Sequence, residues 1–556
     1  MSVSILYDNP KETLIHRLLS VRGIQSDPSL FLYPTFEKLW KDPSLLEGMD
    51  VAIERILTAM SRQENIMIFG DYDVDGVTSS WLVYTFFHTF LQYPHISIRL
   101  PNRLSDGYGI KNYHLDEIKS AGVSLVITVD CGITAVAEVA HATSIGLDMI
   151  ITDHHHAGDT LPEAIAVINP QVSPNYLFKW LCGIGVAFKL VRWLTQQLKP
   201  QNKKEIFEYL MPMVAIGTVA DCVPLVDENR LFVQRGLQLL NEGKGVPESL
   251  LQFIEYVGIK KPVTSYHIGY VIWPRINAGG RILSPYESLN SLLYTGDRQI
   301  AHLAKIDELN TERKKTQDEM FKTAEKIVDL TQKILFVASE DFHEGIIGIV
   351  AGRLTEKYHR PSVVMSINHD KWLGVASLRG PSYFSVIDML YEVQHLLERY
   401  GGHQQAGGLT ITVDRIDTLQ TALQEYGTII TDELLVKHIN IDTPLYVSDF
   451  LDLKEIEKIW LLEPFGQGNP EPVFVVQAAK VLSITKVGKT GNGHLKLSIQ
   501  HGEVVIDVLF WSKGGSIDTL NYEVGSVVDI IATMRIDPSK AIGCYLCGQE
   551  VMVLSS

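Results

Sequence analysis

The chain has 556 residues, 46% of them hydrophobic and 21% charged, which is the composition of an ordinary globular protein with about three or four domains. No apolar run reaches the roughly 18–20 residues that a membrane-spanning helix needs. The formal net charge of −16 argues mildly against nucleic-acid binding, although a local basic groove can coexist with an acidic site.

Cysteine usage and the N-terminal sequence predict a cytoplasmic protein. Five cysteines are too few for a disulfide framework in a chain of this length, so a reducing cytosol is expected. Met1–Asp8 has neither the basic n-region nor the apolar h-region of a signal peptide. Cys544 and Cys547 form a lone C-x-x-C, which is more typical of a strand with two small apolar residues than of a zinc site.

The first expected element is a small helical lead-in over residues 1 to about 45, with an irregular stretch that contains proline. From there to the low 200s, apolar strands alternate with helices, which is typical of a parallel sheet with right-handed crossovers. The expected strands are Ile66–Gly70, Ile96–Leu100, Val123–Asp130 and Asp148–Asp153, and the expected helices cover residues 80–90, 114–121 and 135–145.

The later part of the chain predicts two further units. A long polar helix is expected from about Asp297 to Leu330, and its length indicates a connector between lobes. A second α/β unit begins at Lys333 and runs to about Val413. Pro470 and Pro472 then precede short strands with glycine turns, which are typical of a small antiparallel barrel. Those strands are Val473–Val476, Leu495–Ile499, Val504–Trp511 and Val527–Met534.

Gly70–Gly76 carries three aspartates at alternate positions, Asp71, Asp73 and Asp75, directly after an apolar strand. In an open α/β sheet, ligands bind beyond the carboxyl ends of the strands, and three carboxylates converging there would repel each other without a divalent cation. A solvated acidic loop and a calcium loop are the alternatives. A calcium loop needs a glutamate six residues after its glycine, where this chain has Leu82, so the calcium interpretation fails.

Three further apolar segments are interpreted in the same way, as strands that end in candidate ligands. They are residues 125–129 before Asp130, residues 149–152 before Asp153–His156, and residues 213–220 before Asp221. One such aspartate is more often a plain turn or cap, but four at one edge of a sheet favour a shared site. The residues expected to converge are Asp73, Asp75, Asp130, His154 and Asp221.

Mixed carboxylate and imidazole ligands indicate the kind of metal and reaction. They suit Mn²⁺, and they suit Mg²⁺ less well because Mg²⁺ prefers oxygen. One carboxylate that bridges two cations about 3.5–4 Å apart would give the two-metal arrangement used for phosphoester hydrolysis.

In this order the motifs resemble those of the DHH phosphoesterase superfamily. The motifs that carry the resemblance are Asp71–Gly76, Asp130–Gly132, Asp153–His155 and Asp221. Four later segments resemble the linker, the DHHA1 domain and the start of the oligonucleotide-binding (OB) fold of the RecJ family. These segments are Pro274–Arg281, Glu344–Arg353, Gly401–Gly408 and Pro464–Pro472. The resemblance covers residues 45 to 550, and it implies a metal-dependent, single-strand-specific 5′→3′ DNA exonuclease of recombination and repair that releases mononucleotides.

The resemblance also implies the fold class. It is an α/β protein in which a parallel-sheet DHH domain is joined by a long helix to a smaller α/β DHHA1 domain, followed by a β-barrel OB-fold. The expected boundaries are 1–45 for the N-terminal lead-in, 46–235 for the DHH catalytic domain, 236–331 for the helical linker, 332–415 for the DHHA1 substrate-binding domain, 416–458 for a connector and 459–556 for the OB-fold nucleic-acid-binding domain.

By resemblance, the cofactor is Mn²⁺ or Mg²⁺, two ions per active site. One ion is expected on Asp75, Asp130, His154 and Asp221, and the other on Asp73 and a bridging Asp130, with Asp71 left open as a further ligand. Related pyrophosphatases have a histidine four residues before the first aspartate of the D-x-D pair. Here that position is Phe69, so weak binding of the second ion is expected. His155 is expected to contact the phosphate or to protonate the leaving oxygen, with a packing role as the alternative, and His156 to face solvent or cap.

Seven residues of the linker and the DHHA1 domain are expected to bind the substrate: Asn277, Arg281, Ser377, Arg379, Gly401, Gly402 and His403. Arginine suits this role because its planar fork binds phosphate oxygens bidentately. Considered alone, the Gly-Gly-His loop is equally typical of a turn that ends a helix after Tyr400. Candidate base-stacking aromatics, each also compatible with a core or rim position, are Tyr108, Tyr270, Trp273 and Tyr383.

The sequence departs from the family at four small residues. Ala376 stands where the family usually has glycine. Gly380 stands where the family usually has serine, which removes one hydroxyl contact to the substrate. Gly279 and Gly407 stand where the family usually has alanine, and these small-for-small changes leave the resemblance intact.

The family implies single-stranded DNA as substrate, single-strand binding protein and a RecQ-type helicase as partners, a monomer and no membrane. Three alternatives stay open. A DHH phosphodiesterase acting on cyclic dinucleotides or short oligoribonucleotides would generally lack the barrel. A non-catalytic scaffold, as in the RecJ-like subunit of the eukaryotic replicative helicase, would lose metal ligands. A manganese-dependent pyrophosphatase is disfavoured by Phe69 and by the chain length. Polarity, processivity, action on RNA and the physiological metal do not follow from the residues.

Overall fold

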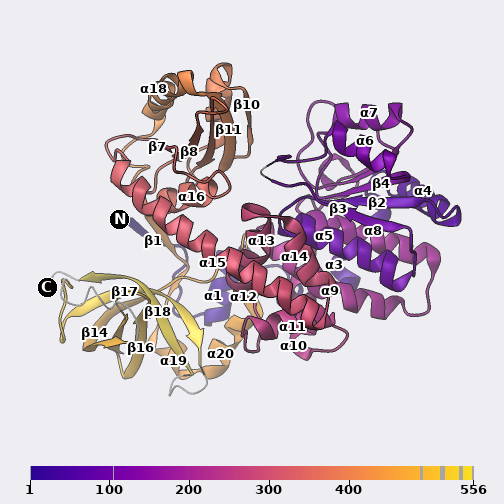
Figure 1. Ribbon diagram of the computed structural model, residues 1–556. Coiled ribbons are helices and arrows are strands. Elements are labelled where there is room, and N and C mark those ends of the chain that lie inside the picture. The colour runs from indigo at the N-terminus through magenta and orange to yellow at the C-terminus, as the bar shows by residue number, and fades with distance from the viewer. Residues whose placement is uncertain (1, 104, 489–492, 514–519, 538–542, 554–556) are drawn as a thin grey trace. The chain divides into compact units, whose positions relative to one another are not determined.

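A computed structural model describes residues 2–103, 105–488, 493–513, 520–537 and 543–553 of the chain (Figure 1). The chain forms two compact units. The barrel unit combines Met1–Trp40, Pro224–Gln234 and His438–Ser556, and the two-sheet unit combines Lys41–Val223 with Arg235–Lys437. Within the described ranges, no helix has both the length and the apolarity required to cross a membrane.

The first sheet of the two-sheet unit has five parallel strands in the order β3-β2-β4-β5-β6. The strands are β2 (Asn65–Phe69), β3 (Ile96–Arg99), β4 (Val123–Val129), β5 (Asp148–Thr152) and β6 (Ala166–Ile168). The surrounding helices are α4 (Met49–Ser61), α5 (Val74–Thr85), its π-helical extension η2 (Phe86–Phe90), α6 (Asn112–Ser120), α7 (Val136–Ser144) and α8 (Gly183–Leu198). Helices α6 and α7 share a core with Phe69, Val126 and Ile151 on one face, and α5 and α8 cover the other (Figure 1). The predicted parallel α/β sheet is confirmed.

Residues 213–220 are not a strand. They form the last part of helix α9 (Lys203–Ala220), so the prediction of a strand before Asp221 is wrong. An unbroken apolar run has no periodicity, and pattern alone does not separate a buried strand from a buried helix. Here the run is buried on all sides because α9 packs against α5 and α8. Asp221 still lies beside the sheet because it is the C-terminal cap of α9.

A set of helices leads from the first sheet to the second. They are α11 (Glu248–Tyr256), α12 (Ser265–His267), the π-helical turn η4 (Ile268–Ile272), α13 (Trp273–Ile282), α14 (Pro285–Leu293) and α15 (Gly296–Ile327). The predicted long polar helix is confirmed as α15, which has 32 residues. Met320 and Phe321 of α15 pack in one core with Leu335 and Val350 of the second sheet and its helix, so the connector is part of that core.

The second sheet has the strand order β10-β11-β9-β8-β7, in which only β7 and β8 are parallel. Its elements are β7 (Leu335–Ser339), α16 (Ile347–Tyr358), β8 (Ser362–Asn368), β9 (Leu373–Arg379), α17 (Val386–Val393), β10 (Arg399–Gly402), β11 (Ala406–Thr412) and α18 (Ile416–Tyr426). Gly401 and Gly402 lie in the edge strand β10, which pairs with β11. The alternative that they form a turn ending a helix is therefore wrong.

Five strands of the barrel unit close into a barrel, as the spacing of short strands predicted, but the last two strands to close it, β16 and β18, pair in parallel, so the barrel is not wholly antiparallel. The sheet runs β13-β14-β15-β16-β18-β17, and β14 also pairs with β17. The strands are β13 (Thr443–Pro444), β14 (Phe474–Val487), β15 (His494–His501), β16 (Val504–Phe510), β17 (Val527–Ile536) and β18 (Cys544–Val553). Cys544 and Cys547 lie in β18 as free thiols, which agrees with the predicted strand.

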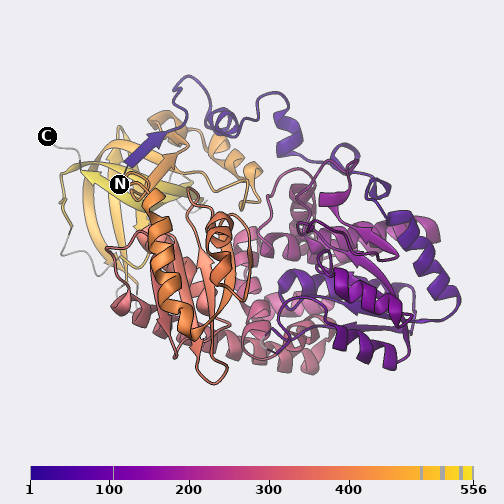
Figure 2. The same ribbon diagram turned by 90° about the horizontal axis from the view of Figure 1, so that it is seen from above.

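The N-terminal lead-in belongs to the same unit as the barrel. Strand β1 (Ser2–Ile5), shown in indigo in Figure 2, pairs in parallel with β12 (His438–Ile441). Leu14 and Leu18 of α1 (Leu14–Val21) are fully buried in the barrel core. The remaining helices of this unit include α2 (Pro28–Leu32), α3 (Phe36–Leu39), the start of α10 (Asp227–Glu242), α19 (Val447–Leu451) and α20 (Leu453–Lys458). The lead-in contains helices, as predicted, but its strand β1 was not predicted.

Candidate metal centre

The aspartates of the first motif lie where β2 ends and α5 begins. Asp73 is the N-cap of α5, and its Oδ1 accepts a hydrogen bond from the backbone N–H of Gly76 at 3.1 Å. Gly76 has no room for a side chain, because an added Cβ would lie 2.5 Å from the backbone nitrogen of Asp71. This close packing fixes the turn that carries Asp71, Asp73 and Asp75 at the edge of the sheet.

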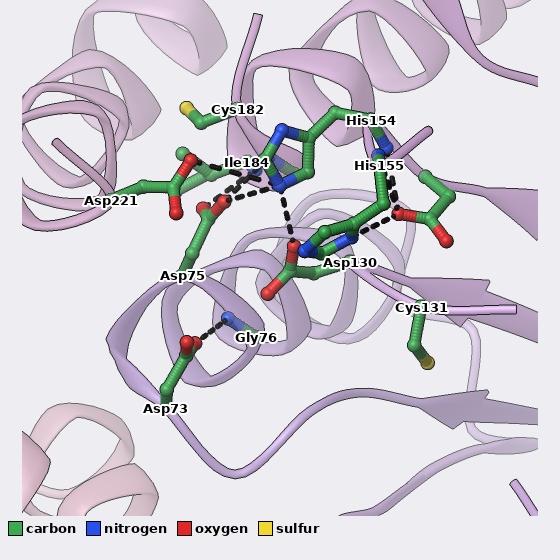
Figure 3. A network of polar contacts seen from close by, with 12 residues as sticks. Asp73, Asp75, Gly76, Asp130, Cys131, His154, His155, Cys182, Ile184 and Asp221 are labelled. Carbon is green, nitrogen blue, oxygen red and sulfur yellow. Dashed lines mark hydrogen bonds and ion pairs between the residues drawn. The ribbon is translucent and has the colours of Figure 1, made fainter. Parts of the chain in front are cut away.

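His154 Nε2 lies among three carboxylates (Figure 3). It is 3.1 Å from Asp130 Oδ1, 3.6 Å from Asp221 Oδ2 and 3.9 Å from Asp75 Oδ2. Burial, followed by the charge of His155, lowers the pKa of His154 to about 3, so the ring is neutral. A neutral imidazole nitrogen among carboxylate oxygens makes a metal-ligand set rather than an ion pair.

Three groups of potential ligand atoms, each with members within 4.8 Å of one another, make up this centre. The groups are Asp75, His154 and Asp221; Asp71, Asp73 and Asp130; and Asp130, His154 and His155. Asp130 occurs in two of the groups, so its carboxylate is placed to bridge two cations, as expected from the sequence. Every residue predicted as a catalytic or metal-binding residue is therefore found in this one cluster.

The electrostatics of the centre fit divalent cations. Burial, and then repulsion from Asp73, raises the pKa of Asp75 to about 7. Burial and neighbouring aspartates likewise raise the pKa values of Asp71, Asp130 and Asp221 well above their usual range. In the described part of the chain, one oxygen each of Asp71, Asp130 and Asp221 is buried without a hydrogen-bond partner. Buried carboxylate oxygens that lack donors, together with one imidazole, are the ligand set of Mn²⁺ or Mg²⁺.

Helix α8 and a strained residue position the inner ligands. The two oxygens of Asp75 accept hydrogen bonds from the backbone N–H groups of Gly183, at 2.5 Å, and Ile184, at 2.9 Å, in the first turn of α8. Asp130 adopts a left-handed backbone with φ of 61°, which non-glycine residues rarely do. A Cβ on Gly183 would lie 2.5 Å from the Asp130 Cβ. The glycine thus lets α8 approach both ligands.

Asp153 orients the two histidines that follow it. It is fully buried, and its carboxylate accepts hydrogen bonds from the backbone N–H groups of Ile133 (2.9 Å), His154 (2.7 Å) and His155 (3.2 Å). His155 Nδ1 lies 2.7 Å from the same carboxylate. Burial alone would lower the pKa of His155, but the hydrogen bond and charge of Asp153, aided by Asp73 and Asp71, raise it to about 9. No role was predicted for Asp153, although its place before three histidines was the available signal.

An arginine cluster lies beside the aspartates. Burial, together with the charges of Arg103, Arg313 and Arg379, lowers the pKa of Arg281 to about 9, while the charge of Asp73 opposes this shift. Burial and Arg103 also lower the pKa of Arg379, whose guanidinium donates to Ser377 Oγ at 3.2 Å. Arg281 donates to the carbonyl of Gly345 at 3.2 Å. Guanidinium groups gathered around Arg281 in this way can bind an anion. Arg103 was not predicted; it follows β3 at the same sheet edge.

The other predicted substrate residues are placed mainly by their elements. Asn277 is 8% exposed on α13, and Gly401 and Gly402 are exposed on β10. The ring of His403 lies 6.1 Å from that of His156, which is exposed as expected. Gly380 is closely packed, because an added Cβ would lie 3.0 Å from Val386 Cγ2.

The four candidate stacking aromatics differ in their surroundings. Tyr108 Oη lies 3.3 Å from His155 Nδ1, which places it at the metal centre. Tyr270 is 71% exposed and stacks on Tyr266 with ring centroids 4.6 Å apart. The Tyr383 hydroxyl donates to the His359 carbonyl at 2.8 Å, and Trp273 begins α13.

Comparison with known families agrees with this organisation. The N-terminal domain of the DHH family matches residues 65–218, the DHHA1 domain matches residues 331–427, and the RecJ OB domain matches residues 441–540. The fold and the site thus define a DHH-family protein with a DHHA1 domain and an OB-fold barrel.

Bacterial proteins of similar sequence identify the family more narrowly. The chain is 34% identical to the single-stranded-DNA-specific exonuclease RecJ of Bacillus subtilis over 94% of its own length, and it spans 66% of that protein. It is 31% identical to the RecJ of Salmonella typhimurium over 95% of this chain and 93% of that one. For the Escherichia coli protein the identity is 32%, with 83% and 82% covered. The chain belongs to the RecJ family.

Solved structures give the same fold. RecJ of Thermus thermophilus in complex with Mn²⁺ superposes with a TM-score of 0.83 at 24% identity, covering 100% of this chain and 80% of that one. An exonuclease RecJ bound to manganese gives a TM-score of 0.60 at 28% identity, covering 70% and 96%.

Proposed function

We propose that this chain is a single-stranded-DNA-specific exonuclease that hydrolyses phosphodiester bonds from the 5′ end with Mn²⁺ or Mg²⁺ and releases mononucleotides, in recombination and repair. The observation that carries the proposal is the cluster of Asp75, Asp130 and Asp221 around the neutral ring of His154, with Asp73 grouped beside Asp130, in a chain of the RecJ family. A 28%-identical RecJ bound to manganese supports the choice of metal.

The proposed metal ligands fall into two sets that share Asp130. Asp75, Asp130, His154 and Asp221 form one set, and Asp73 and Asp130 form the other, with Asp71 as its third member. When bound, a pair of divalent cations supplies Lewis-acid charge and lowers the pKa of water so that it can attack phosphorus. Asp75 is held for this role by the N–H groups of Gly183 and Ile184. Phe69 supplies no ligand, which supports weaker binding on the second set.

His155 is proposed as the cation that contacts the phosphate or gives a proton to the leaving oxygen. Its pKa of about 9 keeps it protonated at neutral pH, and Asp153 fixes Nδ1. A charged imidazolium does not bind a metal, so its presence in a ligand group with Asp130 supports a role toward substrate. A simple packing role would not need a charge held by a buried carboxylate.

The arginine cluster supports the proposed substrate contacts. Arg281 and Arg379 keep N–H donors that their contacts with Gly345, Ser377 and Leu378 do not use, and arginine binds phosphate oxygens bidentately. Asn277, Ser377, Gly401, Gly402 and His403 are proposed as further contacts to the strand. The OB-fold barrel is proposed to extend the path of a long strand by backbone and stacking contacts.

The deciding experiment is an assay of 5′-phosphorylated single strands of about 20–40 nucleotides carrying a label at either end, a range chosen to exceed OB-fold site sizes. With Mn²⁺, a 5′ label should appear at once in mononucleotides, whereas a 3′ label should remain on gradually shortened strands. Duplex DNA should resist. Asp75→Ala should abolish the activity, and Asp159→Asn, an exposed aspartate of the same domain, should leave it unchanged.

Other outcomes would favour the alternatives. Activity confined to dinucleotides would point to a phosphodiesterase, which the barrel argues against. Equal behaviour of wild type and Asp75→Ala would point to a scaffold, which the complete ligand set argues against. Hydrolysis of pyrophosphate alone would point to a pyrophosphatase.

The cellular setting is part of the proposal. The RecJ family supports single-strand binding protein and a RecQ-type helicase as partners, a monomeric state and a cytoplasmic location. The partners and the monomeric state can be checked with the purified chain, by pull-down with either partner and by light scattering.

A further inference from the structure

Helices α13 and α15 run side by side in a fixed register. Arg275 of α13 forms an ion pair with Asp307 of α15, with Nε and Oδ1 2.8 Å apart. Ile282, which follows Arg281, packs against the core that contains Met320, and Arg313 lies two helical turns before Met320 on the same side of α15. Arg281 and Arg313 therefore lie where the two helices meet, and the charge of Arg313 acts on Arg281. Where the first pair attracts, the second pair repels.

The side chain of Arg313 is held in place by neutral hydrogen-bond acceptors, so its charge is not neutralised by an ion pair. Its Nε and Nη2 donate to Asn310 Oδ1 at 3.2 and 2.9 Å, and its Nη1 donates to Gln317 Oε1 at 2.9 Å. Both acceptors are neutral amides, and Asn310 is only 2% exposed. Asp318, whose charge also acts on Arg313, already pairs with Arg353 at 2.6 Å. Two of the five N–H donors of Arg313 are left without an acceptor in the described residues.

We propose that Arg313 is a phosphate-binding residue of the substrate site, which shares one non-scissile phosphate of the single strand with Arg281. The proposal rests on the proposed function. Arg281 lies within electrostatic range of both Arg313 and the metal-centre residue Asp73, so the shared phosphate would lie next to the catalytic one. Two half-buried guanidinium groups on separate helices that repel each other are stabilised by an anion that both can bind, and a backbone phosphate offers oxygens to both.

Lys315 offers a matched control. It lies two residues away on the same helix, carries the same charge and is exposed, whereas Arg313 is half-buried. Arg313→Gln and Lys315→Gln therefore change the net charge equally. If the positive side chains of α15 attracted the strand only through long-range electrostatics, the two variants would bind it equally.

The test is equilibrium binding of a fluorescent 5′-phosphorylated strand of about 20 nucleotides, a length of order one or more OB-fold sites, in EDTA, where hydrolysis does not occur. One lost contact to a single-strand phosphate should reduce the slope of log K against log salt concentration by about 0.7 in Arg313→Gln. Its affinity at about 0.1 M salt should fall roughly tenfold. Lys315→Gln should keep the wild-type slope. Equal slopes in the two variants, or an Arg313→Gln slope equal to wild type, would overturn the proposal.

A second variant keeps the test decisive if Arg313→Gln does not fold. Arg313→Lys retains the charge but not the planar fork, so it should keep the salt slope and bind more weakly than wild type. Wild-type affinity in Arg313→Lys would overturn the proposal. Failure of the proposed function has a different signature, because the wild-type chain itself would then neither bind nor degrade single-stranded DNA.

Discussion

The buried carboxylate of Asp153 keeps His155 protonated at the edge of the metal centre. The Asp153 carboxylate is fully buried and satisfied by N–H groups from Ile133, His154 and His155, so it acts as a fixed negative charge. The sequence predicted His155 as a site residue but not the residue that charges it. The bond from Ile133, 20 residues away, depends on two strand ends meeting, and no local pattern records that. In contrast, Asp73, Asp75, Asp130 and His154 were predictable because each follows a recognisable strand.

Asp153→Asn is expected to change the pH dependence of hydrolysis. Asparagine keeps the shape but removes the charge, so the pKa of His155 should fall from about 9 toward its ordinary value near 6.5. A histidine with a raised pKa is protonated below that pKa and loses its proton as pH rises through it. The variant should therefore lose about 10–100-fold in kcat/KM at about pH 8 and recover much of it at about pH 6. A pH–rate profile from about pH 5 to about pH 10 measures this.

One form of the pH–rate profile of Asp153→Asn would contradict this prediction. A uniform loss of activity at every pH would mean that Asp153 only supports the fold of the loop. His156→Gln provides a control, because His156 is exposed and adjacent in sequence, and its profile should match wild type.

At the scale of elements, the positions where strands end were easier to predict than the helices that pack against those strand ends. The strands at residues 65–69, 96–99, 123–129 and 148–152 lie where the sequence placed them, because parallel strands buried on both faces are continuous apolar runs. The same reasoning failed at α9, where an apolar run proved to be a buried helix. Gly183 was also out of reach, since it is required by atoms of Asp130, which is far away in sequence.

Gly76→Ala tests the close packing at the start of α5. An added Cβ would meet backbone atoms of Asp71 at 2.5 and 2.6 Å, and backbone cannot move aside as a flexible side chain can. We expect a loss of about 1–3 kcal/mol in the free energy of unfolding and a smaller stabilisation by Mn²⁺, because Asp71 and Asp73 must shift. Thermal unfolding with and without Mn²⁺ measures both. The control is Gly352→Ala in α16, where a Cβ meets nothing within 4 Å; alanine there should be neutral or stabilising. Equal effects at both positions would contradict the packing argument.

At the scale of the whole molecule, the sequence predicted which kinds of domain occur but not which segments build them. The barrel was predictable from its short alternating strands. Its unit also includes Met1–Trp40 and Pro224–Gln234, and β1 pairs with a strand whose His438 lies 436 residues after Ser2. Pairing over such a separation leaves no local signal in either strand. The three segments must therefore be joined by specific contacts, and Arg230 makes the clearest one.

Arg230 is 1% exposed and joins all three segments of the barrel unit. Its guanidinium donates to the carbonyls of Phe31 at 2.8 Å, Leu461 at 2.9 Å and Leu462 at 2.9 Å, and lies 3.9 Å from the centre of the Phe31 ring. Burial lowers its pKa to about 9, so it stays charged at neutral pH. Arg230→Gln would deprive the half-buried carbonyls of Phe31 and Leu461 of their guanidinium donor, whereas the Leu462 carbonyl would keep its hydrogen bond from Asn469. Each carbonyl left without a donor costs about 1–3 kcal/mol.

We therefore expect Arg230→Gln to lower the unfolding midpoint of the barrel unit by several degrees, about 4–8 °C per kcal/mol in a domain of roughly 60–100 residues and less in a larger one. Mn²⁺ is proposed to bind residues of the two-sheet unit, so added Mn²⁺ should raise the other transition and leave this loss unrestored. Differential scanning calorimetry measures the unfolding transitions of the two units separately. Arg235→Gln is the control on the same helix: its pair with Glu208, at 2.7 Å, is near the surface and contributes at most about 1 kcal/mol. If Arg235→Gln destabilised the chain as much as Arg230→Gln, the three-segment junction would not depend on Arg230.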